Sequence, residues 1–193
     1  MTPRRSARVP LRATALALVA VFLSACGGGE EAAPPAEAPT SVPDRPLASP
    51  RPVPPFAYET LDGDELSSGT LAGRITVIGF LSTYDAASQA QARILADLLR
   101  QHTPRINVAA LALEPPQNLP LVEAFTRSLR LSYPVALADA ETIAGTGPFA
   151  GLHHVPSVVI LDRRGREVHR RLGLAPRGVL EEILRAVERA SPP

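Results

Sequence analysis

Few side chains in this sequence could carry out covalent chemistry, and thiols are the scarcest of them. The chain has one cysteine, Cys26, and the residues after it have none. Disulfide exchange and cysteine-based peroxide reduction both require a thiolate, so residues 27–193 can do neither with a thiol of their own. The other candidates are Asp85 and Ser88, which are close in sequence, and the adjacent pair His153 and His154.

Asp85 and Ser88 are expected at the start of a helix, directly after the apolar run 75–81. A carboxylate at a helix N-terminus accepts hydrogen bonds from free backbone N–H groups, and the helix dipole lowers its pKa. We therefore interpret Asp85 as a helix cap rather than a catalytic acid. Ser88 is a poor nucleophile unless a base is paired with it.

A metal site built from Asp85 and one histidine is a weak hypothesis. Two or three ligands without a characteristic spacing do not match a zinc or copper motif. Adjacent residues on a strand point to opposite faces, so His153 and His154 are not expected to share an ion. Ser82, Ser88 and the histidines could suggest hydrolysis, but the sequence has no nucleophile elbow. No metal and no cofactor are expected.

The elements that would position these residues alternate between strands and helices. Nearly continuous apolar runs predict strands that are covered on both faces, and apolar stripes at helical spacing predict the helices. We predict strands at residues 75–81, 106–113, 134–137, 157–161 and 166–172, and helices at 85–101, 119–129, 139–144 and from residue 176. In the second helix, the inward-facing residues are predicted to be Leu121, Val122, Phe125 and Leu129.

Residues 56–190 are long enough to form one domain with a substantial core. The formal net charge of the chain is +1, and its arginines are scattered. No stripe of aromatic and basic residues is present, so no nucleic-acid partner is expected. His102 and His169 are expected on the solvated surface.

The first 25 residues predict a lipoprotein signal peptide, although an uncleaved anchor and an ordinary secretory signal are alternatives. Arginines at positions 4, 5, 8 and 12 precede an apolar run that is too short to cross a bilayer of roughly 30 Å. The run ends in Leu-Ser-Ala-Cys26, which resembles the bacterial lipobox and implies cleavage before Cys26 and lipid attachment to it. Several acyl chains, at about 0.8 kcal/mol per buried methylene, would anchor the chain to a membrane.

Residues 26–55 are expected to form a disordered tether, because they are rich in proline and alanine and have almost no large apolar residues. Residues 191–193 are expected to be a short tail. No acidic residue follows Cys26 directly, so inner-membrane retention is not indicated and the outer membrane is favoured. The expected location is the bacterial cell envelope, facing the periplasm.

The order of the elements and three sequence segments resemble the thioredoxin-like proteins of the TlpA, ResA and peroxiredoxin-related group. Residues 56–63 (FAYETLDG) resemble the opening segment of that group, and residues 71–74 (LAGR) resemble the turn before its central strand. Residues 151–165 (GLHHVPSVVILDRRG) resemble its cis-proline segment and the hairpin that follows. The resemblance implies a three-layer α/β/α sandwich with a mixed central sheet.

The resemblance also implies where the chemistry of active relatives would lie. Asp85 and Ser88 stand at the positions of the two cysteines of the CxxC pair, and Tyr84 replaces an aromatic residue before them. Pro156 resembles the cis-proline, and the backbone of Val155 would offer β-augmentation to an extended peptide. Alternatively, Pro156 only shapes a loop. His154 replaces a glycine that is frequent in relatives.

Three functions follow as hypotheses, and no catalytic residue is assigned in any of them. The first is a redox-inactive, membrane-tethered module that binds an envelope protein or peptide through Tyr84, Asp85, Val155 and Pro156. The second, by family resemblance only, is a thiol–disulfide oxidoreductase or peroxiredoxin-type antioxidant that uses a thiol from elsewhere. The third is a carrier of a metal or small ligand. Fold alone does not decide between them.

Overall fold

The computed structural model describes residues 47–190. The predicted signal peptide, the lipidation of Cys26, the tether before residue 47 and the tail 191–193 lie outside the described residues. No helix in the described part of the chain is long and apolar enough to cross a membrane.

A mixed sheet of five strands lies at the centre of residues 47–190, in the order β5-β4-β3-β6-β7. Strands β3, β4 and β5 are parallel to one another, and β6 runs antiparallel to both β3 and β7. The strands are β3 (Ile75–Leu81), β4 (Ile106–Ala112), β5 (Val135–Leu137), β6 (Ser157–Leu161) and β7 (Glu167–Leu172).

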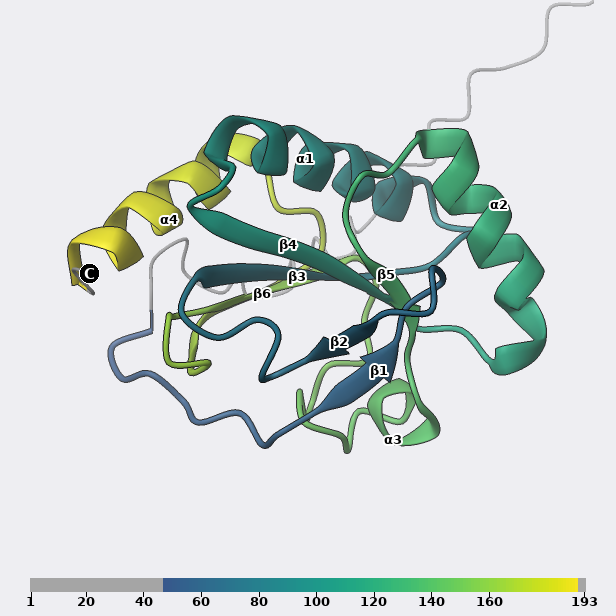
Figure 1. Ribbon diagram of the computed structural model, residues 1–193, viewed down its shortest axis with the longest axis horizontal. Helices are drawn as coiled ribbons and strands as arrows, with labels where there is room; N and C mark the ends of the chain where they lie inside the picture. Colours follow the sequence, from purple (N-terminus) through teal and green to yellow (C-terminus); the bar gives the residue numbers. More distant parts are fainter. Residues whose placement is uncertain (1–46, 191–193) are drawn as a thin grey trace, which may run out of the picture. The chain divides into compact units, whose positions relative to one another are not determined.

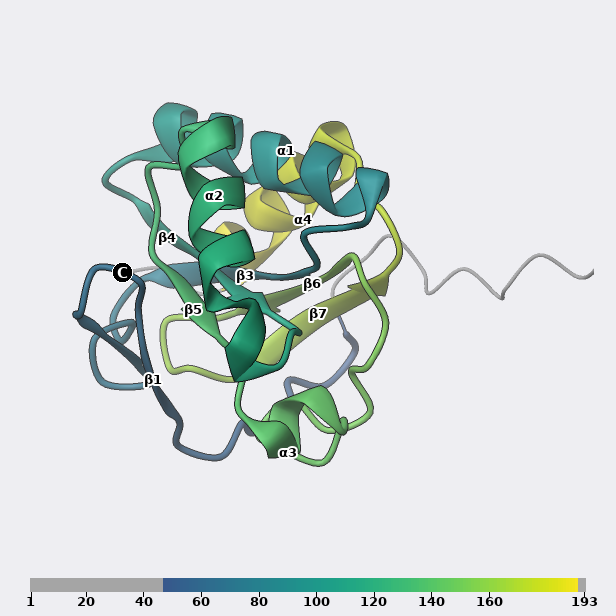
Figure 2. The same cartoon turned by 90° about the vertical axis from the view of Figure 1, so that its right-hand side faces the viewer.

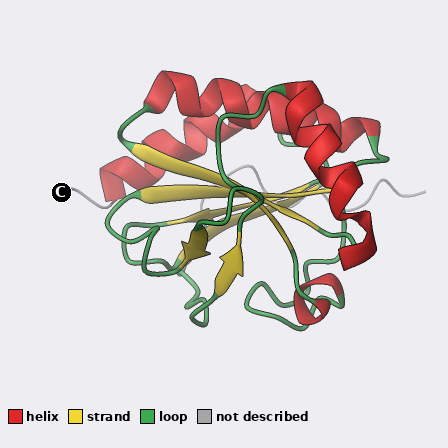
Figure 3. Cartoon of the chain, turned by 45° about the vertical axis from the view of Figure 1, so that its right-hand side comes forward, coloured by secondary structure: helices red, strands yellow, loops and turns green. Residues whose placement is uncertain are grey.

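Helices cover one face of this sheet, and a hairpin with one short helix covers the other (Figures 1 and 2). The helices of the first layer are α1 (Ala86–His102), α2 (Leu119–Leu129) and α4 (Arg177–Ala190). The opposite layer contains β1 (Ala57–Glu59), β2 (Glu65–Ser67) and α3 (Ala140–Ile143), and a 3₁₀ turn, Pro116–Asn118, precedes α2. The predicted three-layer sandwich with a mixed sheet is confirmed, and Figure 3 shows the long helices above the strands and one short helix below them.

The apolar run of β3 is continuous because both faces of the strand are covered. All residues of β3 are buried, and neighbouring side chains point to opposite faces. Val77 packs in the cluster beneath α1 and α4, whereas Ile78 packs in the cluster with Phe56 and Phe149. The two cores therefore meet at β3.

The burial of two side chains differs from the sequence-based expectation. Leu121 is 55% exposed, because the inward stripe of α2 runs through Val122 and Leu121 lies about 100° away from it. His169 is buried, not solvated. It lies opposite Ile160 in the ladder, on a strand whose outer edge is covered by another segment of the chain.

That covering segment is the last part of the predicted tether. The N–H of Leu47 donates to the carbonyl of Val168 (2.6 Å), and Arg51 exchanges backbone hydrogen bonds with Glu167 (2.8 Å each). The Arg51 guanidinium also binds the buried Glu167 carboxylate at 2.7 and 2.8 Å. Residues 47–51 therefore lie along the first half of β7, although their composition predicted no order.

Candidate functional site

The candidate site lies at the end of the sheet where β3 stops and β6 starts. The antiparallel register pairs Phe80 of β3 with Ser157 of β6. Because the two strands run in opposite directions, Pro156 comes beside the residues that follow Phe80. Helix α1 begins just after this point, so Tyr84 and Asp85 lie at the same end of the sheet as Pro156.

Asp85 is the N-cap of α1, and the prediction of a structural cap is confirmed. Its carboxylate accepts hydrogen bonds from the N–H groups of Ala87 (3.3 Å) and Ser88 (2.8 Å) and from the Ser88 hydroxyl (2.8 Å). Partial burial acts to raise the pKa of Asp85, but the hydrogen bonds from Ser88 and Ala87 outweigh it and hold the pKa below its ordinary value. The group is therefore a carboxylate at neutral pH and not a proton donor.

The Ser88 hydroxyl is committed to hydrogen bonds on both sides. It donates to Asp85 at 2.8 Å and accepts from the N–H of Ser82 at 3.1 Å. The side chain is completely buried. A hydroxyl that is inaccessible and donates its proton to a carboxylate that caps a helix is not an activated nucleophile, so the geometry does not support hydrolytic chemistry at Ser88.

Glu114 supports this loop from the end of β4, and the sequence reasoning missed it. Its buried carboxylate accepts hydrogen bonds from the N–H of Thr83 (2.5 Å), the hydroxyl of Ser82 (3.4 Å) and the amide of Asn118 (2.9 Å). A charged residue directly after the apolar run of β4 was the available signal. Because buried carboxylates need several donors, Glu114 ties the loop before α1 to the loop before α2.

Three large apolar side chains are exposed around Pro156. Tyr84 is 77% exposed, and Leu172 and Leu174 are 42% and 40% exposed. The N–H of Gly173 donates to the carbonyl of Pro156 at 2.8 Å, so the two leucines flank Pro156 on the side of β7, and Tyr84 follows β3 on the other side. The exposed apolar side chains therefore lie in the two segments that border the start of β6.

Val155 directly precedes Pro156 and is half-buried. The Val155–Pro156 peptide bond is cis. Within residues 47–190, no hydrogen-bond partner is found for the backbone N–H or C=O of Val155. These backbone groups lie before the first paired residue of β6, where an extended peptide could pair with them.

His153 and His154 are exposed, and their ring centroids are 4.4 Å apart. The expectation that they point to opposite sides is wrong, because they lie in the loop before β6 rather than on a strand. Within the described range 47–190, no group of three or more histidine, cysteine, aspartate or glutamate side chains is placed to hold a metal ion. The two rings contact each other in a tilted arrangement, with an angle of 41° between their planes.

No model of a known protein family matches this chain. No curated protein is significantly similar to it in sequence.

Solved structures are similar to it in fold. A thiol:disulfide interchange protein of the thioredoxin family from Chlorobium tepidum has a TM-score of 0.63 and 21% identity, over 73% of this chain and 98% of that one. A DsbF homologue from Corynebacterium diphtheriae has a TM-score of 0.63 and 17% identity, over 72% and 87% of the two chains. StoA from Bacillus subtilis has a TM-score of 0.58 and 17% identity, over 70% and 99%.

At these identities the similarity establishes the fold and leaves the activity open. The mixed five-stranded sheet and the helices that cover it agree with this fold. The described part of this chain therefore has a thioredoxin-like fold, and it has no cysteine at the positions of Asp85 and Ser88 or anywhere else in residues 47–190.

Proposed function

We propose that this protein is a redox-inactive, lipid-anchored thioredoxin-like module that binds an envelope protein or peptide. Its binding surface would comprise Tyr84, Asp85, Val155 and Pro156. Cys26 would hold the domain on the bacterial cell envelope, facing the periplasm and with the outer membrane favoured.

The observation that carries the loss of redox activity is the absence of a thiol at Asp85, at Ser88 and in the rest of residues 47–190. The state of Ser88 shows in addition that its hydroxyl is not available for other chemistry. Its hydroxyl is buried and satisfied by Asp85 and Ser82. The polar atoms at the start of α1 thus stabilise the helix and the loop before it. No reactive group at this position is left to attack a substrate.

The observation that favours binding is the apolar surface around Pro156. Exposed side chains of this size gather at one end of the sheet, at Tyr84, Leu172 and Leu174, beside the unpaired backbone of Val155. Exposed apolar patches mark interaction surfaces, and an unpaired strand end recognises an extended peptide through its main chain. Both features survive without a thiol.

Site-directed photo-crosslinking tests this proposal in the native envelope. A photoreactive amino acid replaces Tyr84 in the anchored chain, and we expect one dominant crosslinked product of defined mass. The same group in place of the exposed Arg189 at the end of α4 is the matched control and should give none. In the variant with the photoreactive residue at position 84, the additional substitution Leu174→Asp should reduce the crosslinked product several-fold. It places a charge beside the bound segment.

The redox part of the proposal has a separate readout. The purified chain should not reduce insulin disulfides or consume peroxide above a heat-inactivated sample. Turnover of either substrate by the chain alone would contradict the redox-inactive assignment. Equal crosslinking at Tyr84 and Arg189 would contradict the binding surface.

A further inference from the structure

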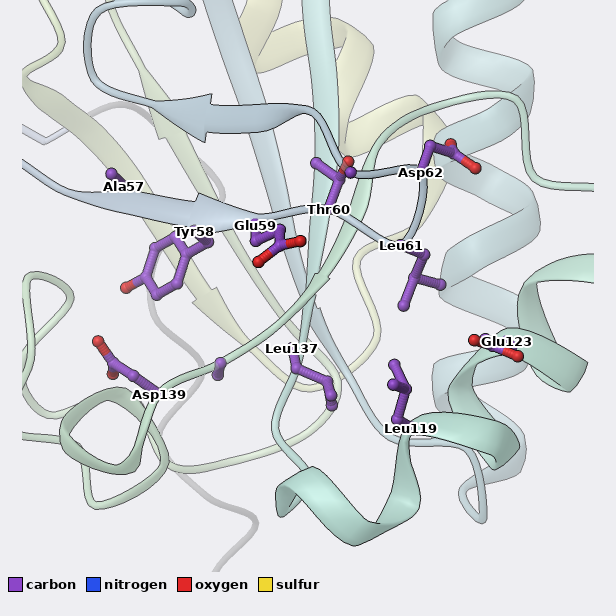
Figure 4. Close-up of a pocket in the computed structure, with 12 residues that line it drawn as sticks. Ala57, Tyr58, Glu59, Thr60, Leu61, Asp62, Leu119, Glu123, Leu137 and Asp139 are labelled. Carbon is purple, nitrogen blue, oxygen red and sulfur yellow. The ribbon is translucent and has the colours of Figure 1, made fainter.

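A cavity of about 690 Å³ lies between β1, α2 and the end of β5. Figure 4 shows Leu61, Leu119 and Leu137 pointing toward one another, with carboxylates around them. Leu119 is 39% exposed here, at the start of α2. The cavity therefore has an apolar floor that opens to solvent.

The outer edge of β1 faces this cavity. The N–H of Thr60 donates to Asp64, and the N–H of Ser68 donates to Phe56, so even-numbered residues of β1 point toward β2. Odd-numbered residues point away from β2 because successive backbone groups alternate. The backbone N–H and C=O of Ala57 consequently point to the cavity.

The edge of β5 faces the cavity from the other side. The N–H of Ala138 donates to Ala112 of β4 (3.0 Å), so the backbone of Leu137 points away from β4. The two edges meet at the bridge between Thr60 and Ala136 and separate beyond it. Within residues 47–190, no strand pairs with β1 on this side at Ala57.

Hydrogen bonds on either side of the opening fix the position of β1 relative to β5 and α3. The N–H of Leu61 donates to Val135 at 2.8 Å, which closes the narrow end. The buried hydroxyls of Tyr58 and Thr142 are 2.8 Å apart and hydrogen bonded, which holds β1 against α3. Burial raises the pKa of Tyr58, so this hydroxyl stays neutral at physiological pH. The opening is thus part of the folded structure.

The charge around the cavity indicates what enters it. Its lining includes the carboxylates Glu59, Asp62, Glu123 and Asp139, and no arginine is among the lining residues that the structure describes. Glu123 has an exposed partner, Arg127, at 3.4 Å. The floor is apolar and the rim is acidic, which complements a segment that carries both apolar and basic side chains.

We propose that this cavity binds an extended segment of another protein, which adds to the edge of β1 as a strand and places arginine or lysine side chains beside an apolar one. The main chain of the segment would pair with Ala57, its apolar side chain would contact Leu119 and Leu137, and its basic side chains would lie near Glu59. This site is separate from the surface around Pro156 and does not depend on the function proposed for that surface.

The probe is a short, fluorescent, end-blocked peptide of alternating arginine and valine, titrated against the purified full chain. We expect saturable binding. A peptide with glutamate in place of arginine should not bind. A peptide with N-methyl groups on alternate amides should bind about tenfold more weakly, because those amides cannot donate to the edge of β1. Equal affinity of the methylated peptide would overturn strand addition.

Variants then locate the site on the chain. Glu59→Gln should weaken binding several-fold, whereas the matched control Glu182→Gln on the exposed face of α4 should not. Ala57→Pro removes an N–H that points to the cavity and should weaken binding without unfolding the domain, as judged by circular dichroism. Tyr84→Ala should leave the affinity unchanged, which separates this site from the proposed peptide surface.

Amide hydrogen exchange shows where on the chain the peptide binds, which affinity alone does not. The peptide should slow exchange at Ala57 and at the residues around Leu137. Protection confined to Val155 would assign the peptide to the other surface and overturn this proposal. A concentration-dependent dimer that is dissolved by Ala57→Pro would also overturn it, because a second copy of the chain would then fill the cavity.

Discussion

The polar side-chain atoms of Asp85 and Ser88 form hydrogen bonds within the protein itself. The carboxylate caps α1, and the hydroxyl links that cap to the N–H of Ser82. In a thiol enzyme the free N–H groups of a helix start stabilise a thiolate. Here they stabilise a carboxylate, so the same electrostatics supports the helix instead of a nucleophile.

The cap makes a pH-dependent contribution to stability. Asp85→Ala should lower the free energy of unfolding by about 1 kcal/mol at pH 7. The pKa of Asp85 is lower in the folded than in the unfolded chain, so this stabilisation is complete above about pH 4 and is lost as the pH falls through the folded-state pKa. Urea unfolding at neutral and acidic pH measures the difference, with Asp62→Ala as control. A difference that does not narrow in acid would contradict the role of the charge.

Introducing cysteines at positions 85 and 88 tests whether the domain lacks disulfide-reducing activity only because it lacks thiols. We expect the double variant Asp85→Cys/Ser88→Cys to reduce insulin disulfides above the background rate of the unchanged chain, because the helix start lowers the pKa of the first introduced thiol. Each single variant is the control and should remain inactive. A folded but inactive double variant would show that this end of the sheet has lost more than its thiols.

At the scale of elements, the candidate site depends on loops that are joined by one buried group. Glu114 follows β4 and contacts Ser82 and Thr83 before α1, and Asn118 before α2. Helices α1 and α2 are therefore coupled at their starts as well as through the apolar core. The orientation of Tyr84 depends on this connection, because Tyr84 follows Thr83 directly.

Removing the carboxylate should destabilise the domain and loosen this loop. Glu114→Ala leaves the part-buried N–H of Thr83 and the buried hydroxyl of Ser82 without this acceptor, at a cost of about 1–3 kcal/mol. Thermal unfolding measures the cost, and Glu182→Ala, an exposed glutamate on α4, is the control. Hydrogen exchange should accelerate at Thr83 and Tyr84 in the Glu114→Ala variant. Unchanged exchange there would contradict the role of Glu114 in holding the loop.

At the scale of the whole molecule, the exposed apolar side chains are not spread evenly. Within residues 47–190 the large ones lie around Pro156, at Tyr84, Leu172 and Leu174, or at the start of α2, at Leu119 and Leu121. Scattered apolar residues are ordinary on a soluble surface, but grouped ones indicate contact with partners. This distribution agrees with the binding role that we propose for the domain.

The proposed lipid anchor at Cys26 concerns the location of the whole molecule and can be tested by cell fractionation. Cys26→Ser should move the protein from the membrane fraction to the soluble fraction of the envelope, because it removes the residue that would carry the acyl chains. Fractionation followed by mass spectrometry of the N-terminal peptide measures both the location and the lipid. The control is Ser24→Thr, which leaves the cysteine in place. A variant without Cys26 that stays in the membrane would contradict lipid anchoring.

The strands and helices of the central sheet were predictable from local patterns. The bounds of β3, α2 and β6 agree with the apolar runs and stripes that predicted them, because elements buried on one or both faces need long apolar segments. The hairpin of β1 and β2 was not predicted. Its strands are only three residues long, which is too short for an alternating pattern to stand out.

The sequence by itself determined the absence of thiols after Cys26, the central sheet and the helix cap at Asp85, because these depend on residue identity and on short-range spacing. Only the tertiary structure decided that Ser88 is buried, that Glu114 contacts Thr83 and that Ala57 faces an acidic cavity. These contacts join residues far apart in the chain, and no local pattern encodes which distant side chain will arrive as a partner.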